Sequence, residues 1–308
     1  MGSDMVSSMP KARNDLAAQL WPVRKQATRR VINGIDRTVG KVVGSRIALS
    51  NTARGSKSQA YLTLSELVSR QLPSDLPLSA YELSVFSQNG EDGILHELFR
   101  RLPVPHTFVE FGIQSGWEGN CVLLADVFGW SGLFIEYDHD GFEALERKYA
   151  YNPQVKTVRA KVTPQNVNAL FAEADVPAEL GILSIDIDGN DYWVWEAVAG
   201  YRPAVLIIEF NSGIPSKEPL VQPFNEGDPS YATFFGANLA ALEKLGASKD
   251  YVLVHTDIAG VNAFFVRRDL LTSSVPTSDS VARHGLNYYL MSSEHRHPES
   301  ERTDWVRP

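Results

Sequence analysis

The sequence comprises 308 residues, 44% of them hydrophobic, and carries a formal net charge of −8 at pH 7. This composition supplies enough apolar surface for a large core and argues against global disorder. No apolar run reaches the roughly 18 residues needed to span a bilayer, and the start of the chain lacks the hydrophobic stretch of a secretory signal. The single cysteine, Cys121, excludes an intramolecular disulfide, so we expect a cytoplasmic setting.

The charge is unevenly distributed along the chain. Residues 1–60 carry 11 Lys/Arg and 3 Asp/Glu, a net charge of +8, and the remaining 18 Lys/Arg and 34 Asp/Glu give −16. The acidic body argues against a nucleic-acid-binding surface. The basic segment is compatible with a solvated leader, an anionic partner, peripheral contact with a membrane, or contacts in a homo-oligomer.

The pattern of breakers and apolar periodicity predicts three parts. Residues 1–78 form a basic, partly helical N-terminal arm, in which Pro22 and Gly34 interrupt the helical pattern. Residues 79–275 form the main domain, and residues 276–308 form a C-terminal tail.

The main domain alternates short apolar runs with amphipathic segments, which predicts strands alternating with helices. Strands are expected at 107–113, 131–138, 155–162, 180–188, 203–211, 250–257 and 260–269. Helices are expected at 119–129, 140–150, 164–174, 191–200 and 230–248. Nearly unbroken apolar strands indicate a mostly parallel sheet covered on both faces, and the last two strands, which lack a helix between them, indicate an antiparallel edge hairpin. The predicted fold is therefore an α/β, Rossmann-like doubly wound seven-stranded sheet with an N-terminal helical arm.

Ligands of such sheets bind beyond the carboxyl ends of the strands, so the polar residues that follow each strand are candidates for function. The first strand ends in the sequence VEFGIQSG, in which Gly112 and Gly116 flank Gln114 and Ser115. Gly112 permits a tight turn and Gly116 permits close approach of a ligand to the backbone. Glu110 lies two residues before this turn.

The second strand ends in LFIEYDHD. An acid at this position can accept hydrogen bonds from both hydroxyls of a ribose, and Glu136 fits because it follows the apolar run directly, with Asp138 as the substitute. A helix N-cap is an alternative role for Asp138 and Asp140.

Acids and an amide also follow the fourth and fifth strands. Asp186 and Asp188 alternate at i, i+2, as do Glu209 and Asn211, so each pair is expected on one face of its strand. Neighbouring strands lie about 4.8 Å apart, so the four side chains can converge on a hard cation such as Mg²⁺. Direct binding of substrate hydroxyls or of a cofactor is the competing interpretation.

Together these motifs resemble class I S-adenosylmethionine-dependent methyltransferases. The sequence FSQNGEDGIL at 86–95 and SIDIDGND at 184–191 resemble the FkbM-like group in particular. The resemblance covers roughly residues 80–270 and implies S-adenosylmethionine as the cofactor, with Glu136 at its ribose. It also implies that Glu110, Gly112 and Gly116 border the methionine end of the cofactor. Four residues of the 86–95 segment are then expected close to the same pocket: Ser87, Gln88, Glu91 and Asp92. The other residues expected to bind the cofactor are Gln114, Ser115, Asp138 and Asp186.

The pairing of acids and an amide on two adjacent strands is also similar to catechol-type, Mg²⁺-dependent O-methyltransferases. The sequence departs from that pattern because Phe210 separates Glu209 from Asn211. A second departure is that the third strand ends in Lys161 and Val162, which replace the usual residue near the adenine.

The expected reaction is methylation of a hydroxyl on a small-molecule or saccharide acceptor. A hydroxyl needs a base or a metal that lowers its pKa, and Asp188 or His255 is the candidate base. The long loop at 211–236 is a candidate acceptor-binding loop, with Lys217, Tyr231 and Phe235. A non-catalytic nucleotide-binding protein and another metal-dependent enzyme remain alternatives, whereas the missing G-x-G-x-x-G pattern argues against a nicotinamide-dependent oxidoreductase.

Overall fold

A computed structural model describes residues 76–214, 217–227, 236–272, 275 and 304–308. All of these residues belong to one compact unit, Ala60–Pro308. The helices predicted in the N-terminal arm, and most of the predicted C-terminal tail, lie outside the described residues.

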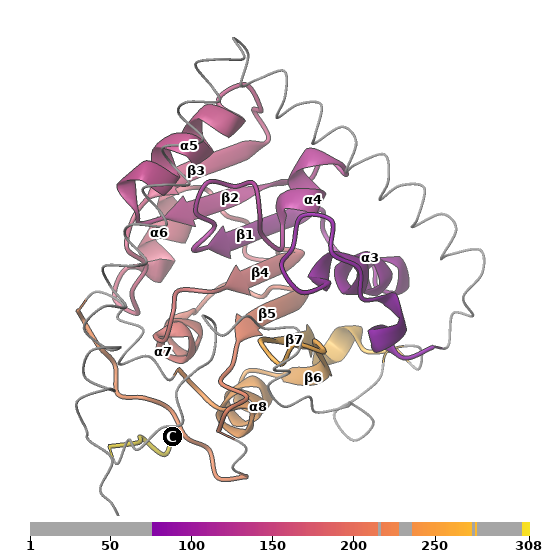
Figure 1. Cartoon of the computed structure of the whole chain (residues 1–308), viewed down its shortest axis with the longest axis vertical. Helices are drawn as coiled ribbons and strands as arrows, with labels where there is room; N and C mark the ends of the chain where they lie inside the picture. Colours follow the sequence, from indigo (N-terminus) through magenta and orange to yellow (C-terminus); the bar gives the residue numbers. More distant parts are fainter. Residues whose placement is uncertain (1–75, 215–216, 228–235, 273–274, 276–303) are drawn as a thin grey trace, which may run out of the picture. The chain divides into compact units, whose positions relative to one another are not determined.

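The described residues build one seven-stranded sheet in the order β3-β2-β1-β4-β5-β7-β6 (Figure 1). The strands are β1 (Thr107–Phe111), β2 (Ser131–Glu136), β3 (Val155–Arg159), β4 (Ile182–Ile185), β5 (Val205–Glu209), β6 (Tyr251–Thr256) and β7 (Asn262–Arg267). The first five strands are parallel, and β7 lies antiparallel between β5 and β6. This arrangement confirms the predicted Rossmann-like doubly wound sheet with an antiparallel edge pair.

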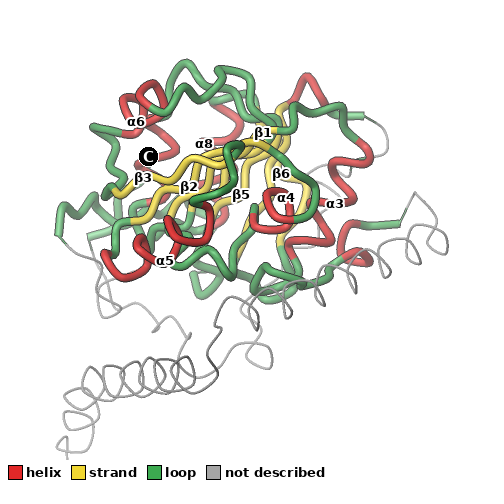
Figure 2. The backbone as a smooth tube through the Cα atoms, turned by 90° about the horizontal axis from the view of Figure 1, so that it is seen from above, coloured by secondary structure: helices red, strands yellow, loops and turns green. Residues whose placement is uncertain are grey.

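Helices cover both faces of the sheet, which explains why its central strands are buried along almost their whole length (Figure 2). The helices are α3 (Glu91–Arg101), α4 (Val122–Asp126), α5 (His139–Tyr149), α6 (Val167–Glu173), α7 (Asp191–Ala197) and α8 (Leu239–Ser248), with 3₁₀ turns at Leu78–Tyr81 and Arg268–Leu270. One core contains α3, α4 and α5, with Leu98 and Phe134 among its buried residues. The other core contains α6, α7 and α8, with Phe171 and Trp195.

The last helix begins later than the sequence pattern predicts. Helix α8 starts at Leu239, and Asn238 caps it by accepting a hydrogen bond from the backbone N–H of Ala241 at 3.0 Å. Ala237 instead forms an isolated antiparallel bridge with Val221. Residues 230–235 of the predicted helix lie outside the described residues.

Among the described residues, no helix is both long and apolar enough to cross a membrane.

Candidate functional site

The strand order reverses between β1 and β4, which lie side by side at the centre of the sheet. From β1 the chain continues outward to β2 and β3, and from β4 it continues outward to β5. In doubly wound sheets this switch point opens a crevice beyond the carboxyl ends of the strands, where ligands bind. The segments that follow β1 and β4 therefore define the candidate site.

The glycine turn after β1 presses directly against the end of β4. Gly112 has a φ of +71°, and a Cβ atom on it would lie 1.9 Å from the backbone oxygen of Asp186. Gly116 also has a positive φ, of +72°. Gln114 is exposed and Ser115 is partly exposed. The turn thus presents exposed backbone at the switch point, and only glycine fits at its first position.

Glu136 at the end of β2 organises this turn. Its carboxylate accepts one hydrogen bond from the backbone N–H of Gln114 at 2.5 Å and another from that of Asp138 at 2.6 Å. Asp138 is the N-cap of α5 and accepts from the backbone N–H of Gly141 at 2.9 Å. The N-cap role proposed for Asp138 is therefore confirmed, whereas Asp140 lies exposed in the first turn of α5.

Glu110 lies deeper than its position in the motif suggests. Its side chain is buried and accepts hydrogen bonds from the backbone N–H groups of Asn120, at 2.7 Å, and Cys121, at 2.9 Å. Burial is the main cause that raises its pKa to about 7. Glu110 thus anchors the segment that leads into α4.

The acids of the SQNGED motif are also buried and hold backbone. One carboxylate oxygen of Asp92 accepts from three consecutive backbone N–H groups ending at Ser87, at 2.6–2.8 Å, and the Ser87 hydroxyl accepts from the Asp92 N–H. Glu91 accepts from the side-chain amide of Asn262, at the start of β7, at 2.8 Å. Gln88 is exposed. The motif therefore joins the start of α3 to the carboxyl edge of the sheet.

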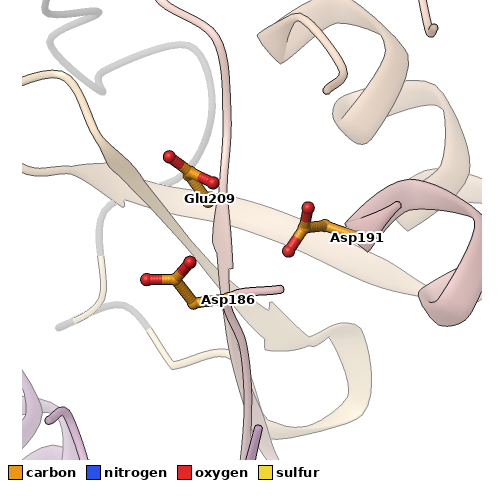
Figure 3. A group of neighbouring side chains, drawn as sticks. All are labelled: Asp186, Asp191 and Glu209. Atoms are coloured by element: carbon orange, nitrogen blue, oxygen red, sulfur yellow. The ribbon is translucent and has the colours of Figure 1, made fainter. Parts of the chain in front are cut away.

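Three acids gather beyond β4 and β5. One carboxylate oxygen from each of Asp186, Asp191 and Glu209 lies within 4.8 Å of the others, and Figure 3 shows the three groups around a common space. Asp191 is held there because its two oxygens accept from the backbone N–H groups of Ile187, at 2.9 Å, and Gly189, at 2.7 Å. We call these three residues the acidic trio.

The acidic trio corrects part of the predicted metal site. Asp188 is exposed, adopts a positive φ of +58° and does not belong to the trio, in which Asp191 takes its place. The side-chain oxygen of Asn211 accepts from the backbone N–H of Gly213 at 2.9 Å, so this residue shapes the turn after β5. Sequence reasoning missed Asp191, although its position at the start of a helix next to a glycine was a usable signal.

The electrostatics of the trio favour neutral carboxyls or a bound cation. Burial raises the pKa of Asp186 well above its ordinary value, and the negative charges of Asp188 and Asp191 raise it further. The pKa of Glu209 is raised in the same direction by burial and then by Asp186. The pKa of Asp191 is raised to about 6 by burial, against the opposing effect of its backbone hydrogen bonds.

The structure does not bring His255 to the trio, which contradicts its predicted role as base. His255 is buried near the end of β6, and its Nε2 lies 2.9 Å from a carboxylate oxygen of Glu82. Glu82 also accepts from the backbone N–H of Ile258 at 3.2 Å. Strands β5 and β7 separate β6 from β4, which places the two strands about 14 Å apart. His255 therefore fastens the segment before α3 to the edge strand.

Comparison with known proteins gives structural neighbours only. No family model matches the sequence, and no curated protein matches it. The N-terminal domain of EvdMO1 with SAH bound shares 13% identity, with 57% of this chain and 79% of that chain covered and a TM-score of 0.40. The citrinin polyketide synthase CMeT domain shares 14% identity, with 57% and 51% covered and a TM-score of 0.37. An S-adenosylmethionine-dependent methyltransferase from Clostridium acetobutylicum shares 10% identity, with 67% and 98% covered and a TM-score of 0.36.

Proposed function

We propose that this chain is an S-adenosylmethionine-dependent methyltransferase that methylates a hydroxyl group. The observation that carries the proposal is the meeting of three features at the switch point of the sheet. These are the exposed glycine turn after β1, the acid at the end of β2, and the acidic trio beyond β4 and β5.

The turn and Glu136 are suited to hold the cofactor. A carboxylate has about four lone-pair sites, and Glu136 uses two of them for backbone N–H groups. The remaining sites can accept the two hydroxyls of a ribose. The absence of a side chain at Gly112 lets the turn lie against the end of β4, and the exposed backbone of Gly112 is available to border the methionine end. The part of these residues is to align the methyl donor, because an in-line transfer depends on the orientation of its reactants.

The acidic trio is suited to a hard divalent cation. Carboxylate oxygens are the ligands that Mg²⁺ prefers, and a cation would neutralise acids that otherwise repel one another. When bound, Mg²⁺ would lower the pKa of an acceptor hydroxyl and fix its orientation. Asp186, Asp191 and Glu209 would hold it, replacing the set of four ligands predicted from sequence.

Asp188 is the proposed general base. It is exposed, and its charge raises the pKa of both Asp186 and Glu209, so it lies close to the trio. A carboxylate at the edge of the site could accept the hydroxyl proton and release it to solvent. The proposed acceptor is a sugar or natural-product hydroxyl, as the sequence resemblance implies.

The proposal is tested by transfer of a radiolabelled methyl group from S-adenosylmethionine to a panel of sugars and phenols, with Mg²⁺ or with EDTA. Asp186→Asn should abolish transfer, whereas Asp140→Asn, an exposed acid in the first turn of α5, should leave it unchanged. Transfer that EDTA does not affect would remove the metal from the proposal. Equal transfer by wild type and Asp186→Asn would overturn the assignment of the trio.

A further inference from the structure

The segment between β5 and α8 makes a detour along the carboxyl edge of the sheet. Figure 1 shows it as an orange trace that runs past α7 towards the end of the sheet that contains α6 and β3. We call its described part at 220–227 the strap. Its first three residues are buried, and its last three, 225–227, are exposed.

The buried start of the strap is anchored on both sides. Val221 forms antiparallel bridges with Ala237 on one side and with Val306 on the other. The bridge to Val306 has two backbone hydrogen bonds, of 2.9 and 3.0 Å. Asn238, which is fully buried, accepts from the backbone N–H of Leu220 at 3.1 Å. This end of the strap therefore has a fixed position.

The exposed end of the strap is fastened to two different strand tips. The side chain of Asn190, beyond β4, donates to the backbone oxygen of Asn225 at 2.7 Å and accepts from its N–H at 3.2 Å. The ammonium of Lys161, beyond β3, donates to the backbone oxygens of Glu226 and Gly227, each at 2.9 Å. Three consecutive residues of the strap are thus bound by polar side chains from the sheet edge.

These two fastenings place the strap beside the candidate cofactor site. Strands β2 and β1 lie between β3 and β4, which are therefore about 14 Å apart. In the strand order, the tips of β2 and β1, with Glu136 and Gly112, lie between these two anchor points. The Lys161 ammonium also lies 5.6 Å from the ring centroid of Tyr137, the residue that follows Glu136.

We infer that the strap forms the outer wall of the nucleoside half of the cofactor site, with Asn190 and Lys161 as its positioning residues. This inference rests on the proposed function and deepens it. Glu136, on β2, marks the proposed ribose position. Because the strap is tied to the tip of β3, the strand next to β2, the strap would border the nucleoside. The acidic trio, beyond β4 and β5, lies towards the methyl acceptor.

The chain offers a matched control for each fastening. The side-chain amide of Asn168, on α6, also donates to and accepts from backbone, but at the end of α7: it donates to the backbone oxygen of Ala197 and accepts from the N–H of Ala199, each at 2.9 Å. Lys156 of β3 donates to the backbone oxygen of Ala174 at 2.6 Å. These bonds do not reach the strap. Replacing either control residue therefore removes side-chain-to-backbone hydrogen bonds of the same kind at a different place in the fold.

The experiment is calorimetric titration with S-adenosylhomocysteine and with 5′-methylthioadenosine, which keeps the nucleoside but lacks the amino-acid end. Asn190→Ala and Lys161→Met should each weaken both ligands by about fivefold, the effect of roughly one net hydrogen bond. Asn168→Ala and Lys156→Met should change either affinity less than about twofold. Asn190 makes no side-chain cap for α7, so its replacement leaves the helix start intact.

Three outcomes decide the inference. A loss shared by both ligands, with unchanged Mn²⁺ affinity, supports the strap as a nucleoside wall. Unchanged affinities in both strap variants, with a wild type that binds, overturn the strap inference but leave the proposed function standing. A wild type that binds neither ligand overturns both. Val306→Pro, which removes the N–H donated to Val221, is a second variant remote from the strand tips and should act in the same direction.

Discussion

Replacing Gly112 with alanine should force apart the ends of β1 and β4. The new Cβ would lie 1.9 Å from the backbone oxygen of Asp186, and a tolerable contact needs at least 3.0 Å, so the two must separate by at least 1.1 Å. Forcing a methyl group into such a space costs about 1–3 kcal/mol. Holding alanine at a φ of +71° adds about 1–2 kcal/mol. We therefore expect a total loss of about 2–5 kcal/mol of unfolding free energy.

Gly200→Ala is the matched control for this prediction. Gly200 has a φ of +80°, but a Cβ there would meet nothing within 4 Å, so only the conformational cost applies. Urea unfolding of both variants measures the difference, which should be about 1–3 kcal/mol in favour of Gly200→Ala. Gly112→Ala should also bind S-adenosylhomocysteine at least tenfold more weakly. Equal stability of the two variants would refute the argument that the turn is pressed against β4.

Three further predictions concern charge. Asp186→Asn should weaken Mn²⁺ binding, measured by paramagnetic relaxation, by at least about tenfold, whereas Asp188→Asn should weaken it less than about threefold. An equally large loss in Asp188→Asn would restore the metal set predicted from sequence. Burial is the main cause that raises the pKa of Asp257 from 3.8 to about 7, so the folded state holds this proton more tightly and loses stability as pH rises from about 4 to 7. In urea unfolding, Asp257→Asn should reduce the fall in unfolding free energy between pH 4 and pH 7 by about 2–4 kcal/mol. An unchanged fall would contradict the raised pKa of Asp257. Lys148→Met should lower the free energy of unfolding by about 3–5 kcal/mol, because it leaves the buried carboxylate of Asp126, 2.9 Å from the Lys148 ammonium, without its cation. Adding Asp126→Asn should recover part of this loss in the same assay. No recovery would argue against the buried ion pair.

The fold could be predicted because its strands are buried on both faces. Runs such as LFI and VLII are apolar without alternation, which distinguishes a covered parallel sheet from a half-exposed one. The place of Glu136 at the end of β2 was also predictable, because this residue follows such a run directly. Its hydrogen bonds to the backbone N–H groups of Gln114 and Asp138 were not predicted.

The composition of the trio could not be predicted from alternation. Asp188 would share a face with Asp186 only if the strand continued to that residue, but β4 ends at Ile185 and Asp188 adopts a left-handed conformation. The turn brings Asp191, at the start of α7, to the place expected for Asp188. A two-residue period holds only while the backbone is extended.

The misplacement of His255 has a different cause. Its position near the end of a strand was read correctly, and β6 does end at the same edge as β4. The lateral order of strands, however, depends on long-range pairing that a single sequence does not encode locally. The insertion of β7 between β5 and β6 moved His255 away from the trio, where Glu82 pairs with it.

The decisive experiment for the proposed cofactor site is calorimetric titration of the wild type and of Glu136→Ala with S-adenosylhomocysteine. We expect one site in the wild type and an affinity at least tenfold lower in Glu136→Ala, because this carboxylate orders the turn after β1 and is the proposed ribose ligand. Absence of binding in the wild type, or equal binding by the two proteins, would contradict the placement of an S-adenosyl cofactor at the switch point.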